Sequence, residues 1–192
     1  MPSPRKKSKK RSTKKKSELD FLLDIDYIKA NTPNLEKMKT TLKKMKTKRV
    51  GLFANKNIKK GDVISCYLIK AYKSSKKILN GVYTVSLYDK NGKDSKLSGD
   101  LCLESLQMPT KNGITYWAYF SNEPSMNEKE NCELDFKNSF KDTKDKMKLT
   151  EGDFVLYKLK ATKNIKKGDE ILWCYGYAKG ERDYKTVCEE EE

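Results

Sequence analysis

The sequence predicts a mostly β domain of the α+β class, with few helices. The first observation is a series of short runs rich in Val, Ile, Leu and aromatic residues, a composition typical of strands. The second is that turns such as Lys-Gly-Asp, Asn-Gly-Lys and Glu-Gly-Asp separate these runs. Strands and helical patterns do not alternate, so a parallel βαβ sheet is not indicated. The length of 192 residues fits one domain with tails.

The chain begins with a strongly basic segment, residues 1–17, which holds nine Lys or Arg and no acid. We expect a disordered tail here, because like charges repel and nothing apolar is available for burial. The segment carries nine of the fifteen net positive charges of the chain. Its composition fits three interpretations: solubility, a nuclear address at residues 5–11, or weak attraction to nucleic-acid phosphates.

Residues 18–48 form a flanking segment before the strand-rich region. Acidic and apolar residues mix over residues 18–28, which favours a short helix packed on the domain. Thr32-Pro33 is a typical start for a second helix. Apolar residues then recur at helical spacing, and this stripe predicts core packing. They are Leu35, Met38, Leu42 and Met45.

The strand-rich region follows. Its predicted strands cover residues 50–54, 63–69, 82–88, 114–120, 154–160 and 171–175. Asp100 is a candidate cap for a short helix over residues 101–108. The polar stretch of residues 135–150 is predicted to be a loop.

Two segments of this region have nearly the same sequence. Residues 54–64 read ANKNIKKGDVI, and residues 161–171 read ATKNIKKGDEI. Each predicts a strand, a polar glycine turn and a second strand. Two distant copies do not make a solenoid, which needs adjacent stacked units. We therefore interpret them as two similar β-turns.

Composition excludes several kinds of site. The chain has no histidine, which rules out Ser-His-Asp and Cys-His nucleophiles and Cys₂His₂ zinc sites. No run of about 20 apolar residues exists to span a membrane, and the charged N-terminus is not a secretory signal. The five cysteines are odd in number and dispersed, which predicts free thiols in a reducing compartment.

Three segments of the chain match, in order, the motifs of one known family. The first reads RVGLFA from Arg49, then IKKGDVI and Tyr67, and is similar to G-x-G-[LV]-F-A…I-x-x-G-x-x-I…Y. The second reads YFSNEPS over residues 119–125, then Asn131-Cys132, and resembles R-F-x-N-H-S-C-x-P-N-C. The third reads IKKGDEILWCYGY over residues 165–177 and resembles I-x-x-G-E-E-L-x-x-x-Y-G-Y. Their order and separation make the joint match specific over about two-thirds of the chain. Together the three segments resemble the SET domain of protein lysine methyltransferases.

The resemblance implies the SET fold, in which small curved sheets surround a C-terminal pseudoknot that threads the Asn122 segment and the C-terminal segment. The SET domain would cover residues 49–178, and residues 179–192 would be a C-terminal segment with an acidic tail. The family uses an I-x-x-G-[DE] turn in both places, which accounts for the repeated sequence. The chain resembles compact stand-alone SET proteins, including those of large DNA viruses, more than it resembles multidomain chromatin enzymes.

The activity implied by the resemblance is methyl transfer from S-adenosylmethionine to a lysine ε-amine. By position, Tyr175 matches the catalytic tyrosine, which orients the amine; we do not expect a general base, because a phenol stays protonated at neutral pH. Tyr67 matches a wall of the substrate channel. Trp173 matches an aromatic that affects how many methyl groups are added, and Tyr177 would help enclose the channel. Without the order of the motifs, these aromatics would be interpreted as strand packing.

The cofactor site implied by the resemblance lies on one short backbone segment and on the second motif. The expected cofactor-binding residues are Arg49, Val50, Gly51, Leu52, Asn122 and Glu123. Gly51 permits close approach of the backbone. No metal is expected, because the family's post-SET C-x-C-x₄-C is absent and only Cys188 follows the last motif.

The chain departs from the family pattern at several positions. Arg49 replaces the first Gly, Glu123 replaces the His of N-H-S, and Pro124 replaces its Ser. Ser125 stands where many members have a zinc-binding Cys. The C-terminal wall of the channel would come either from residues 179–187, with Tyr184 as a candidate, or from a second subunit in a homodimer.

Three functions follow as hypotheses. The leading hypothesis is a protein-lysine methyltransferase that acts on histone tails in the nucleus, which is the nucleus of the host cell if the chain is viral. The basic tail would make weak contact with DNA. A non-histone substrate and a cytoplasmic location are variants of this hypothesis. The second is a SET-like module that binds protein without catalysis, which the departures at Arg49 and Glu123 favour. The third is a small basic nucleic-acid-binding protein.

Overall fold

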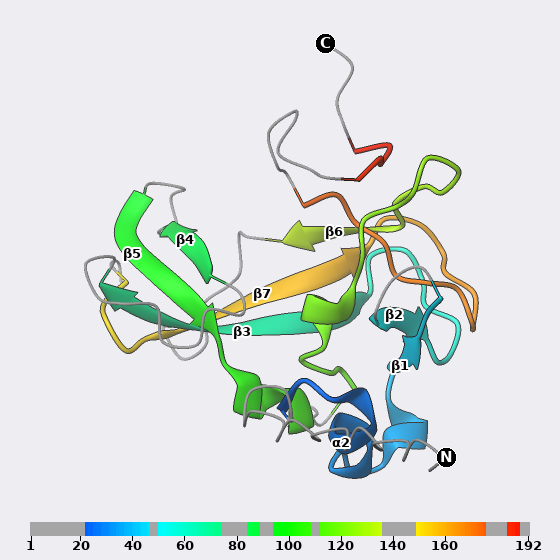
Figure 1. The fold of residues 1–192 in the computed structure, drawn as a ribbon, viewed down its shortest axis with the longest axis horizontal. Helices are drawn as coiled ribbons and strands as arrows, with labels where there is room; N and C mark the ends of the chain where they lie inside the picture. The colour runs from blue at the N-terminus through cyan, green and yellow to red at the C-terminus, as the bar shows by residue number, and fades with distance from the viewer. Residues whose placement is uncertain are drawn as a thin grey trace, which may run out of the picture.

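An antiparallel five-stranded sheet forms the largest part of the protein. The structure is a computed structural model, which describes residues 22–46, 50–73, 84–88, 94–108, 112–135, 149–175 and 184–188. The strand order of this sheet is β4-β5-β3-β7-β6. Its strands are β3 (Val63–Lys73), β4 (Thr84–Tyr88), β5 (Asp94–Leu101), β6 (Cys132–Asp135) and β7 (Phe154–Ala161). A separate two-stranded sheet pairs β1 (Thr40–Lys44) with β2 (Val50–Ala54). Figure 1 shows the small sheet at one end of the large one. The predicted mostly β class is confirmed.

The central strand β3 brings Tyr67 into the interior. Residues 64–69 of this strand are all buried, which is the pattern of a strand covered on both faces. Tyr67 lies opposite Tyr157 of β7 in the antiparallel register. The predicted strands at 50–54, 63–69, 82–88 and 154–160 correspond to β2, β3, β4 and β7.

The predicted helical stripe of residues 35–45 is wrong. Only a 3₁₀ turn, η1 (Leu35–Lys37), forms there, and the chain then extends into β1. Leu42 pairs with Leu52 of β2, and both side chains are fully buried. The β-branched Thr40 and Thr41 and the available partner strand favour extension, so tertiary pairing outweighs the helical spacing.

Short helices line one side of the sheet. Helix α2 (Ile25–Ala30) is capped by the Asp24 side chain, which accepts from the Asp26 N–H at 3.0 Å. It buries Ile25 and Ile28 and overlaps the end of the predicted helical stretch of residues 18–28, of which residues 18–21 are outside the described part of the chain. Figure 1 shows α2 below the sheet beside the 3₁₀ turn η2 (Leu103–Gln107).

Two further local predictions need correction. Residues 114–120 do not form a strand: a single parallel bridge joins Thr115 to Ser65, and the 3₁₀ turn η3 (Ala118–Phe120) follows. Asp100 does not cap the helical turn η2, because it lies at the end of β5 and its carboxylate accepts from Thr84 Oγ1 at 2.7 Å. Both segments are held by long-range bonds that a local pattern does not reveal.

Residues 170–175, the inserted segment, lie between other parts of the chain. On one side the Ile171 N–H donates to the Leu52 carbonyl of β2 at 2.8 Å. On the other, Leu172 bridges Asn122, and its carbonyl accepts from the Asn131 N–H at 3.0 Å. This insertion delivers the residues after Leu172 to the face of β3 that carries Tyr67.

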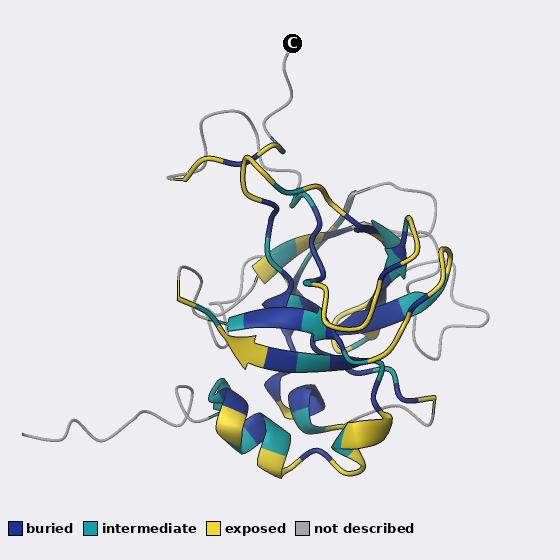
Figure 2. Cartoon of the chain, turned by 90° about the vertical axis from the view of Figure 1, so that its right-hand side faces the viewer, coloured by how far each residue is buried: buried dark blue, intermediate teal, exposed yellow. Residues whose placement is uncertain are grey.

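The core lies where the sheets, the helical turns and the inserted segment meet. Figure 2 shows buried residues concentrated there and exposed residues on the turns at the rim. Trp117 is among the largest fully buried side chains, and its indole N–H donates to the Leu106 carbonyl at 2.6 Å. No helix within the described ranges is long and apolar enough to cross a membrane.

Candidate functional site

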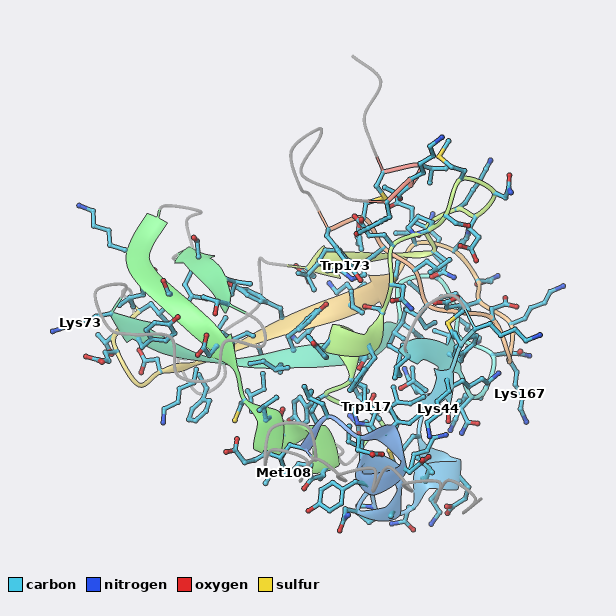
Figure 3. The ribbon with its side chains drawn as sticks, viewed as in Figure 1. Lys44, Lys73, Met108, Trp117, Lys167 and Trp173 are labelled. Carbon is cyan, nitrogen blue, oxygen red and sulfur yellow. A yellow bond between two sulfur atoms is a disulfide. The ribbon has the colours of Figure 1, made fainter. Side chains whose placement is uncertain are left out.

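Three aromatic side chains from distant parts of the sequence meet beside the inserted segment. The ring centroids of Tyr67 and Trp173 are 6.4 Å apart and edge-on, and those of Trp173 and Tyr175 are 5.2 Å apart. Tyr67 and Trp173 are buried, whereas Tyr175 is partly exposed. Figure 3 shows Trp173 above the central strands. The structure thus brings together three of the four predicted aromatic residues; the fourth, Tyr177, lies outside the described residues.

Both ends of Tyr175 are fixed by the 121–123 segment. Its hydroxyl donates to the Ser121 carbonyl at 2.6 Å, and its backbone N–H donates to Glu123 Oε1 at 2.7 Å. Because the hydroxyl proton is committed to Ser121, the phenol oxygen keeps its lone pairs for an incoming N–H donor. The tyrosine is therefore preorganised as an acceptor.

Asn122 joins the small sheet to the aromatic residues. Its side-chain amide donates to Glu170 Oε1 at 2.8 Å and to the Val50 carbonyl at 3.2 Å. Its backbone carbonyl accepts from the Trp173 N–H at 3.1 Å. One residue thus ties β2, the Glu170 carboxylate and the aromatic segment together.

The strand β2 contributes backbone more than side chains to this region. A methyl group added at Gly51 would lie 2.6 Å from Met45 Sδ, 2.8 Å from Phe53 Cε2 and 3.0 Å from Glu170 Oε1. The Leu52 side chain is fully buried in the core, opposite Leu42. Arg49, the residue that replaces the family's first Gly, lies outside the described residues.

Glu123 faces the C-terminal end of the chain. Its carboxylate is 5% exposed, accepts the Tyr175 N–H, and also accepts the Tyr184 hydroxyl at 2.6 Å. A second bond joins Thr186 Oγ1 to the Pro124 carbonyl at 2.6 Å. The side chain that replaces the family's His therefore connects the Tyr175 backbone with residues 184–188.

A disulfide between Cys174 and Cys188 fastens the same segment covalently. The expectation that all five cysteines are free thiols is wrong for this pair. The two Cα atoms are 5.4 Å apart, within the usual range of a disulfide, because Tyr184 and Thr186 hold the segment against residues 123–124. The spacing of Cys174 and Cys188 in the sequence did not indicate that their Cα atoms lie this close.

We expect alkylation to distinguish the cysteines of the native protein. Burial raises the pKa of the Cys66 thiol to about 12 and raises the pKa of Cys132 further, so both stay as unreactive thiols at pH 8. Cys102 is half-buried, and iodoacetamide should add one label there. After mild reduction, mass spectrometry should find three labels, the new ones on Cys174 and Cys188. Three labels without reductant would contradict the disulfide.

Trp173 carries an unsatisfied polar group in the site. Its indole Nε1 is buried and has no hydrogen-bond acceptor among the described residues. A buried unpaired donor costs about 1–3 kcal/mol, so a ligand that supplies an acceptor would gain that energy. Among the described residues, no three His, Cys, Asp or Glu side chains gather in a way that could hold a metal ion.

Sequence reasoning missed Glu170 and Ser121, and it quoted Asn131 without a role. Glu170 was visible only as the residue after the second Gly-Asp turn, and its contact with Asn122 spans 48 residues. Ser121 acts through its carbonyl, which carries no side-chain signal. Asn131 donates from Nδ2 to the Glu170 carbonyl at 2.7 Å and accepts the Leu172 N–H at 3.0 Å.

A family model described as SET domain matches residues 49–176. The chain is similar to the methyltransferase domain of human PR domain-containing protein 2, with 19% identity, a TM-score of 0.44, and coverage of 91% of this chain and 100% of that one. It is also similar to a candidate histone methyltransferase of Plasmodium falciparum, with 18% identity, a TM-score of 0.44, and coverage of 73% and 96%. No curated protein sequence matches the chain.

Proposed function

The chain belongs to the SET-domain family, and on that premise we propose that it is an S-adenosylmethionine-dependent protein-lysine N-methyltransferase. The observation that carries the proposal is the meeting of Tyr67, Trp173 and Tyr175 beside the Asn122 junction. An aromatic channel next to backbone and polar groups suits an amine on one side and a polar cofactor on the other. When bound, the cofactor supplies an electrophilic methyl group.

Tyr175 orients the lysine amine in this proposal. Its hydroxyl donates to the Ser121 carbonyl, and its oxygen accepts an N–H of the incoming amine. A fixed acceptor restricts the direction of the nitrogen lone pair, and alignment of two reactants is a large part of the rate gain in such reactions. Tyr175 needs to accept no proton for this role.

Tyr67 and Trp173 form the walls that strip water from the lysine side chain. The aromatic faces attract a cationic amine and pack against its methylene groups. Both residues are buried, so the proposed channel would have a low dielectric. The unpaired indole N–H of Trp173 would find its acceptor on the bound ligands.

The cofactor would be held at β2 and Asn122. The Val50 carbonyl and the Glu170 carboxylate accept the two N–H groups of the Asn122 amide, and each keeps a lone pair suited to an ammonium group. The amino end of an amino acid therefore has partners here. The Arg49, Gly51 and Leu52 backbone is proposed to lie along the cofactor, with Glu123 contributing through its main chain.

The substrate proposed for this site is a histone tail. Residues 1–17 are basic throughout and would keep the enzyme near DNA, which also suits action in the nucleus. Tyr184, held on Glu123, supports the hypothesis that residues 179–187 complete the channel within one chain rather than in a homodimer.

The proposal is tested by methyl transfer. The purified chain is incubated with methyl-labelled S-adenosylmethionine and with nucleosomes, free histones or a cell lysate. We expect label on protein, identified as ε-N-methyllysine by mass spectrometry, and saturable cofactor binding by calorimetry. Binding without transfer to any protein would favour a non-catalytic SET-like module. Absence of cofactor binding would overturn the proposal.

Gly51→Ala should weaken cofactor binding about tenfold or more. The added methyl group would push against Phe53 and against the Glu170 carboxylate that holds Asn122. Overpacking of this kind costs about 1–3 kcal/mol, and about 1.4 kcal/mol already corresponds to a factor of ten in an equilibrium constant. Calorimetry with S-adenosylhomocysteine measures the loss. Ile64→Val, a core change of similar cost in β3, should leave the affinity unchanged. Equal affinity in both variants would remove Gly51 from the proposed site.

A further inference from the structure

The two repeated segments pack against each other as a pair. Ile58 and Ile165 exchange backbone hydrogen bonds in both directions, each of 2.9 Å. The Asn164 side chain accepts the Lys60 N–H and the Asn57 side chain accepts the Lys167 N–H, also at 2.9 Å each. Every bond from one copy has its counterpart from the other, so the pair has local two-fold symmetry. Residues 54–62 and 161–169 are called the paired turns below.

The reciprocal bonds continue to the ends of two strands, β7 of the five-stranded sheet and β2 of the two-stranded sheet. The Gly61 N–H donates to the Ala161 carbonyl and the Gly168 N–H to the Ala54 carbonyl, both at 2.8 Å. Ile58 and Ile165 are buried between the copies. The backbone of the paired turns is therefore held together by main-chain and asparagine bonds, and none of the bonds between the two copies comes from a lysine side chain.

The lysines of the paired turns occupy three equivalent positions in each copy. All six are exposed to solvent: Lys56, Lys59, Lys60, Lys163, Lys166 and Lys167. Lys56 bonds the Lys37 carbonyl at 2.8 Å, while the other five ammonium groups have no hydrogen bond or ion pair to a described residue. Figure 1 shows the cyan and orange turns side by side at the right, and Figure 3 shows Lys167 pointing away from the body there.

The paired turns concentrate the positive charge of the folded part. They contain six lysines and two aspartates, a net charge of +4. The chain outside residues 1–17 has a net charge of only +6. One aspartate, Asp62, is already 3.6 Å from the ammonium group of Lys39, which adds a further cation at the edge. Glu170, the next acid, points inward to Asn122.

We propose that the paired turns bind the phosphate backbone of duplex DNA. Lysines on a rigid support attract phosphates as point charges and release counterions, without reading base sequence. None of the exposed large apolar side chains of the described residues lies on the paired turns. Insertion into a membrane would need such side chains, and single-stranded nucleic acid would need aromatic rings for stacking. The surface therefore fits duplex phosphates, independently of methyl transfer.

The test compares two variants of the full chain that lose the same charge. One replaces four lysines of the paired turns with glutamine: Lys59, Lys60, Lys166 and Lys167. The control replaces four exposed lysines elsewhere: Lys70, Lys73, Lys129 and Lys185. Binding to a short duplex DNA of random sequence is measured by fluorescence anisotropy between about 50 and 200 mM salt. Circular dichroism verifies that both variants are folded, and residues 1–17 are present in all three proteins.

The paired-turn variant should lose at least about tenfold in affinity at low salt, and its salt slope should fall by about two to four. The control should stay within about twofold of the parent protein. Equal losses in both variants would show that net charge alone attracts DNA and would overturn the proposal. Stronger binding to anionic vesicles or to single-stranded DNA than to the duplex would overturn it as well.

Discussion

Tyr175→Phe should lower the turnover number by an order of magnitude or more and leave the protein folded. The change removes one hydroxyl, which is the group proposed to accept the amine N–H, while the ring keeps its packing against Trp173. A tenfold loss corresponds to about 1.4 kcal/mol of transition-state stabilisation. Single-turnover rates with labelled cofactor measure the effect, and calorimetry should find the cofactor affinity within about threefold of the parent.

The matched control is Tyr27→Phe, which removes the same atom from a tyrosine on α2, outside the aromatic cluster. Its turnover should equal that of the parent protein. Near-normal turnover of Tyr175→Phe would contradict the role given to this hydroxyl. A loss confined to cofactor affinity would instead place Tyr175 in the cofactor site.

Asn131→Ala should destabilise the fold by about 2–5 kcal/mol. The side chain bonds the Glu170 carbonyl and the Leu172 N–H, both in the inserted segment. Its removal leaves two main-chain groups without partners in a region where Asn131 is only 7% exposed. Each unpaired buried group costs about 1–3 kcal/mol. Urea denaturation gives the difference in the free energy of unfolding.

Asn131→Asp separates the two bonds, because aspartate keeps an acceptor for Leu172 but has no donor for Glu170. It should fall between the parent protein and the alanine variant. Asn127→Ala, on an exposed turn, should change the free energy of unfolding by less than about 0.5 kcal/mol. Equal stabilities of Asn127→Ala and Asn131→Ala would show that Asn131 does not hold the inserted segment.

The sequence predicted those strands whose residue composition suits their place in the middle of the sheet. β3 and β7 are rich in β-branched and aromatic residues and lie in the middle of the sheet, so local preference and tertiary position agree. β1 was missed because Thr40–Lys44 is short and its apolar residues also fit a helical spacing. Only the partner strand β2, which places Leu42 opposite Leu52, decides between the two.

Site residues whose side chains belong to a sequence motif were predicted, whereas contacts between residues far apart in the sequence were not. Tyr67, Trp173 and Tyr175 were found by resemblance, and their meeting depends on an insertion that no local pattern encodes. The contacts of Glu123 with Tyr184 and of Cys174 with Cys188 follow from the path of the C-terminal segment. The repeated sequence was interpreted as two similar turns. Their pairing with each other depends on the tertiary structure, which the repeat does not indicate.

The most direct test of the account is to locate the cofactor on the protein. Isotope-labelled chain is titrated with S-adenosylhomocysteine while the amide resonances are followed. The account predicts saturable shifts at Val50–Ala54, at the Asn122 side chain and at Tyr175, with little change along β4 and β5. Saturable shifts confined to other strands, or no binding at all, would contradict the claim that this junction is the methyl-transfer centre.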